Sequence, residues 1–323
     1  MRKTATILSL FAASCAFATF TETDTEFDRN SPAGTVNGWI VSGSGSASDI
    51  QSQDTSALLF DDVTINFDSI KGTTINVGNG AKFQYSNDFS IGTKGNVVLN
   101  FKSGSTDSLI TTTGLATSAN NAADAGYVVI NVEKGYAGTI KLPVIGVVKG
   151  NIEMNLHNAY ALNNTRVYAS NVTKLNMSAD QKIVWDYRRN DIATFQINIT
   201  NGAGLFVDRV YGAGDNSSAK VKLAGEDLMD GYIYFLKSIV NSFDNEAKTI
   251  TLNRSNKDYT ISFVDKNNNE VNGESYSNFQ IGETTINGKD YIFATVTSIP
   301  EPSAWAAIFG AIALGLAVYR RRK

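Results

Sequence analysis

Cysteine, histidine and proline are scarce in this sequence. The 323 residues contain one cysteine, one histidine and four prolines. A single cysteine, Cys15, excludes disulfides within the chain and cysteine-based metal sites. A single histidine, His157, excludes multi-histidine metal sites and mechanisms that need two histidines. We therefore expect no cofactor and no bound metal, and we expect stability to come from packing and backbone hydrogen bonds.

Stretches with helical periodicity are missing from residues 19–299. Short runs of alternating apolar and polar residues occur instead, separated by Gly, Asn, Asp and Ser. Such alternation is typical of strands with one face in a core. The sequence therefore predicts an all-β body.

An asparagine between two apolar residues recurs through this body. The asparagines of these triplets are Asn66, Asn76, Asn100, Asn131, Asn155, Asn176 and Asn198. The last four are 24, 21 and 22 residues apart, which is about the length of one coil in a parallel β-solenoid. We expect a right-handed parallel β-helix over residues 57–201.

Two arrangements of these asparagines are open. Inward-facing amides would hydrogen-bond up and down the stack, whereas outward-facing amides would be the polar half of an alternating strand. Because side chains alternate between the two faces of a strand, the flanking apolar residues should face the core and the asparagines should face solvent. We favour the outward arrangement, with the row of amides as a candidate surface for glycans.

The segments on either side of the expected solenoid differ from it. Residues 19–56 are polar, with Gly and Ser concentrated at 42–48, and predict a flexible lead-in or an N-terminal cap. Residues 202–297 combine longer strands with loops, and Asn287-Gly288 indicates a tight hairpin turn. We expect this part to cap the solenoid with antiparallel strands, because an open end exposes unpaired strand edges.

Residues 186–191 are the densest cluster of side chains suited to catalysis. The candidates in it are Asp186, Arg188, Arg189 and Asp191. β-Helical polysaccharide lyases and glycoside hydrolases place acids, bases and tyrosines on one face of their coils, so an enzyme of that kind is the alternative function. A solvated loop explains the cluster equally well, and we expect no catalytic activity.

Two groups of residues carry side-chain oxygens of the kind that bind calcium. They are the pair Asp61-Asp62 and the run Asp265, Asn267 and Asn269. The run lacks the glycine and the distal glutamate of an EF-hand loop. We therefore expect no metal site there.

Residues 1–18 have the three parts of a secretory signal peptide. Arg2 and Lys3 form a positive start, residues 7–17 are mostly apolar, and Ala16-Phe17-Ala18 supplies the small-x-small pattern that signal peptidase reads. We place cleavage after Ala18. A second interpretation is a lipobox, in which Cys15 would be lipidated.

The last twenty-four residues combine three features. Pro300-Glu301-Pro302 precedes an uncharged run, 304–319, and a basic end formed by Arg320, Arg321, Arg322 and Lys323. As a helix the run would be about 24 Å long, slightly short of a ~30 Å hydrocarbon core, and the residues at its end can snorkel. The basic cluster should stay on the cytoplasmic side, which places everything upstream outside the cytoplasm.

This order of features, together with the signal peptide, resembles the PEP-CTERM sorting domain of Gram-negative bacterial surface proteins. The matching residues are Pro300, Glu301, Pro302, the segment 303–318 and Arg320, Arg321 and Arg322. The resemblance implies recognition by an exosortase, a membrane-embedded cysteine-type processing enzyme, and an association with exopolysaccharide, biofilm or floc. It covers residues 298–323, about a tenth of the chain, and concerns sorting rather than the body.

Charge and location narrow the expected function of the body. The whole chain has a net charge of −3, and the two ends contribute +2 and +3, which leaves −8 for residues 19–299. Such a charge argues against nucleic acid as a partner. We expect an exported structural or binding protein, anchored in the inner membrane on the periplasmic side before processing and later found at the cell surface or in the extracellular matrix. An autotransporter passenger would share such a body, but its class needs a C-terminal barrel, which about twenty-four residues are too few to form.

Overall fold

The computed structural model describes thirteen parts of the chain. They are residues 19–22, 39–46, 58–68, 70, 74–77, 91–111, 115–117, 127–147, 151–168, 173–186, 194–211, 218–254 and 257–296. Within these residues the secondary structure consists of strands and one short 3-10 helix, η2 (Lys237–Ile239), so the prediction of an all-β body is confirmed. Among the same residues, no helix has the length and apolar character needed to cross a membrane.

Twenty-three strands make up most of the described residues. In chain order they are β1 (Thr19–Glu22), β2 (Trp39–Ser46), β3 (Leu58–Phe67), β4 (Thr74–Val77), β5 (Ile91–Phe101), β6 (Ser108–Thr111), β7 (Leu115–Thr117), β8 (Tyr127–Val132), β9 (Ile140–Lys141), β10 (Val144–Val147), β11 (Asn151–Leu156), β12 (Thr165–Tyr168), β13 (Thr173–Met177), β14 (Gln181–Asp186), β15 (Thr194–Ile199), β16 (Ala203–Tyr211), β17 (Ser218–Leu223), β18 (Gly231–Leu236), β19 (Val240–Asp244), β20 (Thr249–Arg254), β21 (Lys257–Val264), β22 (Phe279–Ile286) and β23 (Lys289–Val296).

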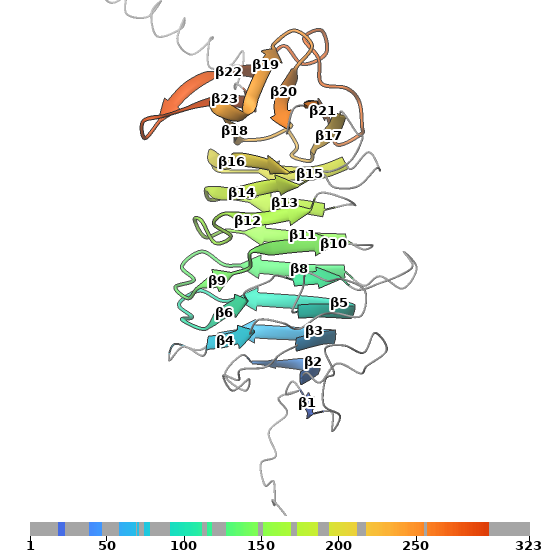
Figure 1. Cartoon of the computed structure of the whole chain (residues 1–323), viewed down its shortest axis with the longest axis vertical. Coiled ribbons are helices and arrows are strands. Elements are labelled where there is room, and N and C mark those ends of the chain that lie inside the picture. The colour runs from blue at the N-terminus through green and yellow to red at the C-terminus, as the bar shows by residue number, and fades with distance from the viewer. Residues whose placement is uncertain are drawn as a thin grey trace, which may run out of the picture.

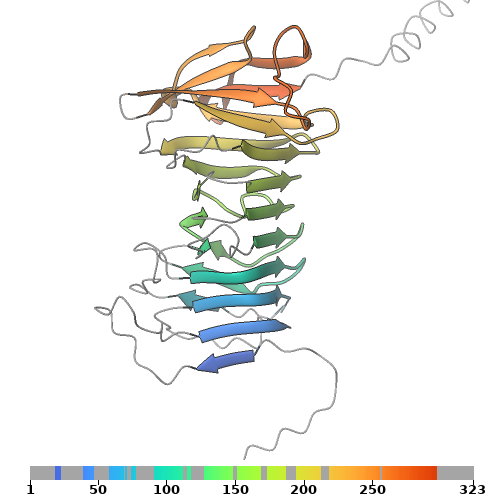
Figure 2. The same ribbon diagram turned by 90° about the vertical axis from the view of Figure 1, so that its right-hand side faces the viewer.

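Most of these strands pair in parallel, in three ladders. The longest runs through β2, β3, β5, β8, β11, β13, β15, β17 and β21. A second runs from β5 through β7, β10, β12, β14 and β16 to β18, and a short third one joins β4, β6 and β9. The chain therefore visits the first two ladders in turn, and its strands stack into a column (Figures 1 and 2).

The core lies inside this column because the inward residues of its strands are mostly apolar. On the longest ladder Leu99, Ile130, Met154, Leu175 and Ile197 are all fully buried. Near the N-terminal end of the column the rings of Phe67 and Phe101 stack with their centroids 4.3 Å apart. Each strand of the ladder thus buries its apolar residues against those of the strands above and below it, which is the stabilising contact between stacked strands.

Pairing changes at the C-terminal end of the chain. β18 pairs antiparallel with β23, and β19 with β20, β20 with β21 and β22 with β23 also run antiparallel. The hairpin turn predicted at Asn287-Gly288 is confirmed, since both residues have positive φ angles, 50° and 75°, and join β22 to β23. Parallel pairing extends beyond residues 57–201, from β2 to β18 and β21.

Candidate functional site

Six of the predicted asparagines lie in one row along the longest ladder. The register pairs Asn66 with Asn100, Asn100 with Asn131, Asn131 with Asn155, Asn155 with Asn176 and Asn176 with Asn198. Asn76 lies elsewhere, on β4 opposite Ile110 of β6. This displacement explains the short ten-residue spacing between Asn66 and Asn76.

Five of these asparagines form what we call the amide ladder. Each Nδ2 donates to the Oδ1 of the preceding asparagine, at 2.8 Å for Asn100 to Asn66 and at 2.7 Å for the three steps up to Asn176. The asparagines are half-buried and their apolar neighbours are buried. The side chains therefore face outward, as predicted, and still hydrogen-bond along the stack, so the two arrangements are combined.

Most of the site residues predicted from sequence lie outside the described residues. This applies to Arg188, Arg189, Asp191, Ala16, Ala18, Pro300, Glu301, Pro302, Arg320, Arg321, Arg322 and Lys323. Asp186 is described, as the last residue of β14. It is fully buried and its Oδ2 accepts a hydrogen bond from Nε of Arg166 on β12. A carboxylate held in this way serves the structure, because a buried charge needs its partner.

Basic side chains gather on the outer face of the second ladder, in what we call the cationic groove. The groove has a volume of about 540 Å³ and is lined by Pro143, Asn164, Arg166, Lys182, Val184, Asp208, Arg209, Tyr211 and Lys289. Strand pairing brings these residues together, since Val184 lies opposite both Arg166 and Arg209. A register shift between β14 and β16 makes Asp208 the extra residue at this point, which is how a β-bulge redirects a side chain.

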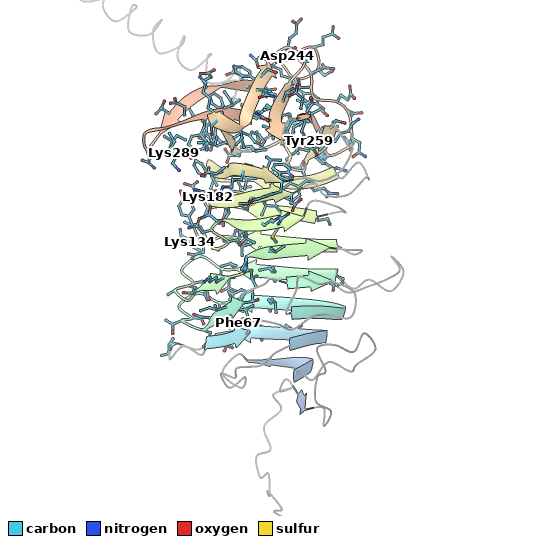
Figure 3. All side chains as sticks on the ribbon, in the orientation of Figure 1. Phe67, Lys134, Lys182, Asp244, Tyr259 and Lys289 are labelled. Atoms are coloured by element: carbon cyan, nitrogen blue, oxygen red, sulfur yellow. The ribbon has the colours of Figure 1, made fainter. Side chains whose placement is uncertain are left out.

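Contacts within the cationic groove hold its side chains in place. Lys182 Nζ lies 2.6 Å from Oδ2 of Asp208, and Lys289 Nζ lies 3.7 Å from the same oxygen. Lys182 and Lys289 lie on the same flank of the column (Figure 3). The guanidinium carbon of Arg166 lies 4.4 Å from the centroid of the Tyr211 ring, a cation–π contact that orients both groups.

A set of stacked rings, the aromatic row, continues the face of the groove toward the C-terminal strands. The pairs Phe206–Tyr234 and Tyr232–Tyr234 stack with centroids 4.8 and 5.3 Å apart. Tyr291 meets Phe206 edge-on at 5.5 Å, and Phe293 meets Tyr232 edge-on at 6.1 Å. Burial raises the pKa of Tyr234 to about 12, so this phenol stays neutral at physiological pH and offers packing surface rather than acid–base chemistry.

Two glycines make room for the aromatic row. A Cβ atom at Gly204 would lie 2.9 Å from Cε2 of Tyr234, and one at Gly282 would lie 2.8 Å from Cζ of Phe293. Both glycines therefore allow the rings to lie close against the backbone, because any larger residue would push the rings away.

Asp265 organises a turn through its oxygens. Oδ1 accepts hydrogen bonds from the backbone N–H groups of Asn267 and Asn269, each at 2.8 Å. Oδ2 accepts from the Tyr276 hydroxyl at 2.6 Å and from Asn269 Nδ2 at 2.8 Å. These bonds, led by the one from Tyr276, lower the pKa of Asp265 to about 2. Four donor groups therefore occupy the two oxygens of this carboxylate.

The cationic groove was not predicted from the sequence. Its cations are far apart along the chain, and each occupies an ordinary outward position of an alternating strand. The available signal was the repeated placement of a cation next to buried residues, as at Lys182 and Arg166, but only the pairing of the strands shows that these positions meet. Comparison with protein-family models, curated proteins and solved structures gives no match.

Proposed function

We propose that this chain is an exported, exosortase-sorted structural or binding protein of the cell surface or extracellular matrix, associated with exopolysaccharide. The observation that carries the proposal is the unbroken parallel ladder of nine strands from β2 to β21, with the amide ladder on its outer face. A stacked repeat of this kind has a long, regular surface, which suits holding an extended polymer.

The architecture that goes with this function is a right-handed parallel β-solenoid with an antiparallel C-terminal cap. Support comes from the alternation of two parallel ladders along the chain and from the 21–24-residue advance between Asn131, Asn155, Asn176 and Asn198. The antiparallel pairs β18–β23 and β22–β23 cover the last parallel strand, which protects its edge from pairing with another molecule.

Sorting in this proposal depends on the two ends of the chain. Signal peptidase removes residues 1–18, and the helix 304–319 holds the chain in the inner membrane until an exosortase processes the segment that contains Pro300, Glu301 and Pro302. The two prolines keep that segment extended and unable to join a helix, which suits presentation to a processing enzyme.

Cell fractionation tests the proposal directly. The full chain and a chain lacking residues 300–323 are expressed in a host that has an exosortase, and each is located by immunoblot. We expect the full chain at the cell surface and the shortened chain free in the periplasm or medium. An alanine replacement of Pro300 and Pro302 should reduce processing and leave the membrane helix intact. Identical location of all three chains would reject the sorting proposal.

The enzyme alternative is tested by incubating the full chain with acidic and neutral polysaccharides and measuring chain length. We expect no cleavage. Cleavage that Asp186→Asn abolishes, in a variant with an unchanged melting temperature, would favour the lyase or hydrolase instead. Asn keeps the size of the Asp186 side chain and removes its charge. The melting temperature must be measured because the lost charge forms an ion pair with Arg166, which stabilises the fold.

A further inference from the structure

We infer that the cationic groove binds a segment of anionic polysaccharide with one carboxylate per sugar ring, and that the aromatic row extends this binding surface. The inference rests on the proposed function, because it names the class of polymer held and the face that holds it. The outer face of β12, β14, β16, β18 and β23 supports it through its charge, its shape and its aromatic lining.

The first support is an excess of positive charge. Four cations line the groove, Arg166, Lys182, Arg209 and Lys289, against one lining carboxylate, Asp208. Arg166 is also paired with the buried carboxylate of Asp186, so two of the four positive charges remain in excess. Asp208 is only 13% exposed and already contacts Lys182 and Lys289. Arg209 is exposed, and it has no carboxylate partner among the residues that the structure describes. A local positive surface on a body of net negative charge marks a place where an anion is attracted.

The second support is the form of the charged groups. Guanidinium groups present planar pairs of N–H donors that match a carboxylate, and ammonium groups add point charges. The guanidinium carbon of Arg166 lies 4.4 Å from the centroid of the Tyr211 ring and Nε donates a hydrogen bond to Asp186, so two contacts hold this group in place. An oriented guanidinium loses less freedom on binding a carboxylate, so the groove is partly preorganised for that anion.

The third support is a continuous row of residues that crosses four strands. The register places Lys182 opposite Phe206, Phe206 opposite Tyr234 and Tyr234 opposite Phe293. Three steps between neighbouring strands span roughly 14 Å. Tyr232 at 37% and Tyr211 at 41% exposure leave part of each ring open to solvent. A sugar ring has an apolar C–H face that packs on an aromatic ring while its polar groups reach the cations beside it.

Acidic polysaccharide fits these features better than nucleic acid does. A uronate polymer offers one carboxylate and one apolar ring face per unit, which matches cations set beside aromatic rings. Duplex DNA carries one charge per ~1.7 Å and would be repelled more strongly by the expected charge of −8 on the body. Nucleic acid is therefore an outcome that the experiment must be able to detect.

Binding to immobilised polymer tests the inference with the purified full chain. Surface plasmon resonance is measured on polygalacturonate, on neutral dextran and on single-stranded DNA, at low and at physiological salt. We expect binding to polygalacturonate that is at least about tenfold tighter than binding to either of the others, and that weakens with salt because the contacts are ionic. Equal binding to dextran, or tighter binding to DNA, would overturn the inference.

Matched variants locate the binding. Arg209→Gln with Lys289→Gln removes two charges from the groove, and Tyr211→Ser removes an exposed ring. The control, Lys134→Gln with Lys174→Gln, removes two exposed charges outside the groove, and Lys134 lies on the same flank as Lys182 (Figure 3). We expect each groove variant to bind polygalacturonate at least about tenfold more weakly, the loss of one charge-assisted contact or more, and the control to change less than about twofold.

The outcomes separate this inference from the proposed function. Unchanged melting temperatures show that the variants are folded. Equal loss of binding in the groove variants and in the control would overturn the groove as the site. Normal surface sorting without polygalacturonate binding would reject the inference and leave the proposed function standing. Groove-dependent binding together with failed sorting would support the inference and reject the proposed function.

Discussion

Asn155 Nδ2 donates a hydrogen bond to Oδ1 of Asn131 at 2.7 Å, across two parallel strands whose residues are 24 positions apart. The same bond recurs between the next pair of strands on either side, always donated toward the N-terminal neighbour. Aligned amides polarise one another, so each bond in such a chain strengthens the next. The amide ladder therefore fixes the register of the longest parallel ladder from its outer face, while the apolar residues fix it from inside.

Removal of one amide should cost more in the middle of the ladder than at its end. Asn131 both donates to Asn100 and accepts from Asn155, whereas Asn66, at the end of the ladder, makes one such bond among the described side chains, in which it accepts from Asn100. We expect Asn131→Ala to lower the free energy of unfolding by about 1–2 kcal/mol and Asn66→Ala by about half as much. Urea titration followed by circular dichroism measures both. The exposed Asn163→Ala, which lies outside the ladder, serves as the control.

If Asn131→Ala and Asn163→Ala have the same small effect, the amides contribute nothing to stability beyond their place on the surface. An effect of Asn66→Ala as large as that of Asn131→Ala would show that the loss of stability does not follow the number of ladder hydrogen bonds removed. The comparison depends on all three residues being asparagines, so the loss of the side chain itself is matched.

The sequence predicted the outward row of asparagines, and it did not predict the hydrogen bonds along that row. The row was predictable because the period of a strand and the repeat of the triplets are both visible in the sequence. The apolar neighbours of Asn131, Asn155 and Asn176 indicate the inward face, and the nearly constant spacing indicates the stack. The triplet at Asn76 has the same local pattern but belongs to the third ladder. Local pattern shows which face a residue occupies, and it does not show which strand it pairs with.

The cationic groove could not be predicted from the sequence in the same way. Arg209 joins the row of Arg166 and Val184 only because the register of β14 and β16 shifts by one residue at Asp208. A bulge depends on how two distant strands fit, so a single strand carries no sign of it. Lys289 reaches the groove from the antiparallel hairpin, over a hundred residues after Lys182.

Asp265 should make stability depend on pH in the acid range. Its pKa is about 2 in the folded protein, below the ordinary value of 3.8, with the Tyr276 hydroxyl as the main cause. A lowered pKa means that the ionised form is favoured by folding, so its contribution is fully present above about pH 3.8 and is lost as the pH falls through about 2. The melting temperature of Asp265→Asn should lie below that of the unaltered chain at neutral pH, and the difference should shrink between these two pH values.

Tyr276→Phe provides the companion measurement for Asp265. It removes the donor at 2.6 Å and leaves the ring, so the acid-range dependence should become shallower. A pH profile identical to that of the unaltered chain would show that the backbone donors of Asn267 and Asn269 dominate instead.

Gly231 occupies a position on β18 that accepts no larger residue. A Cβ atom there would lie 2.3 Å from the carbonyl oxygen of Ala203 and 2.3 Å from Cγ2 of Ile199, and the first of these is backbone in the neighbouring strand. We expect Gly231→Ala to destabilise the chain by about 3 kcal/mol, because the strands must separate. Gly202→Ala is the comparison, since Gly202 has open space and a φ of +67°, which costs about 1–2 kcal/mol. A ranking in the opposite order, measured by urea titration, would contradict the close packing of β16 and β18.

The ion pair between Arg166 and Asp186 offers a test of how the wall of the groove is held. Asp186 is fully buried, so Arg166→Met leaves its carboxylate without this partner and should lower the free energy of unfolding by about 3 kcal/mol. Arg166→Met combined with Asp186→Leu removes both charges, and most of the loss should be recovered because no buried charge is left. The four chains form a double-mutant cycle, measured by urea titration, in which the two effects should be strongly non-additive. Additive losses would mean that Asp186 is stabilised without Arg166, and that the ion pair does not hold Arg166 in the groove.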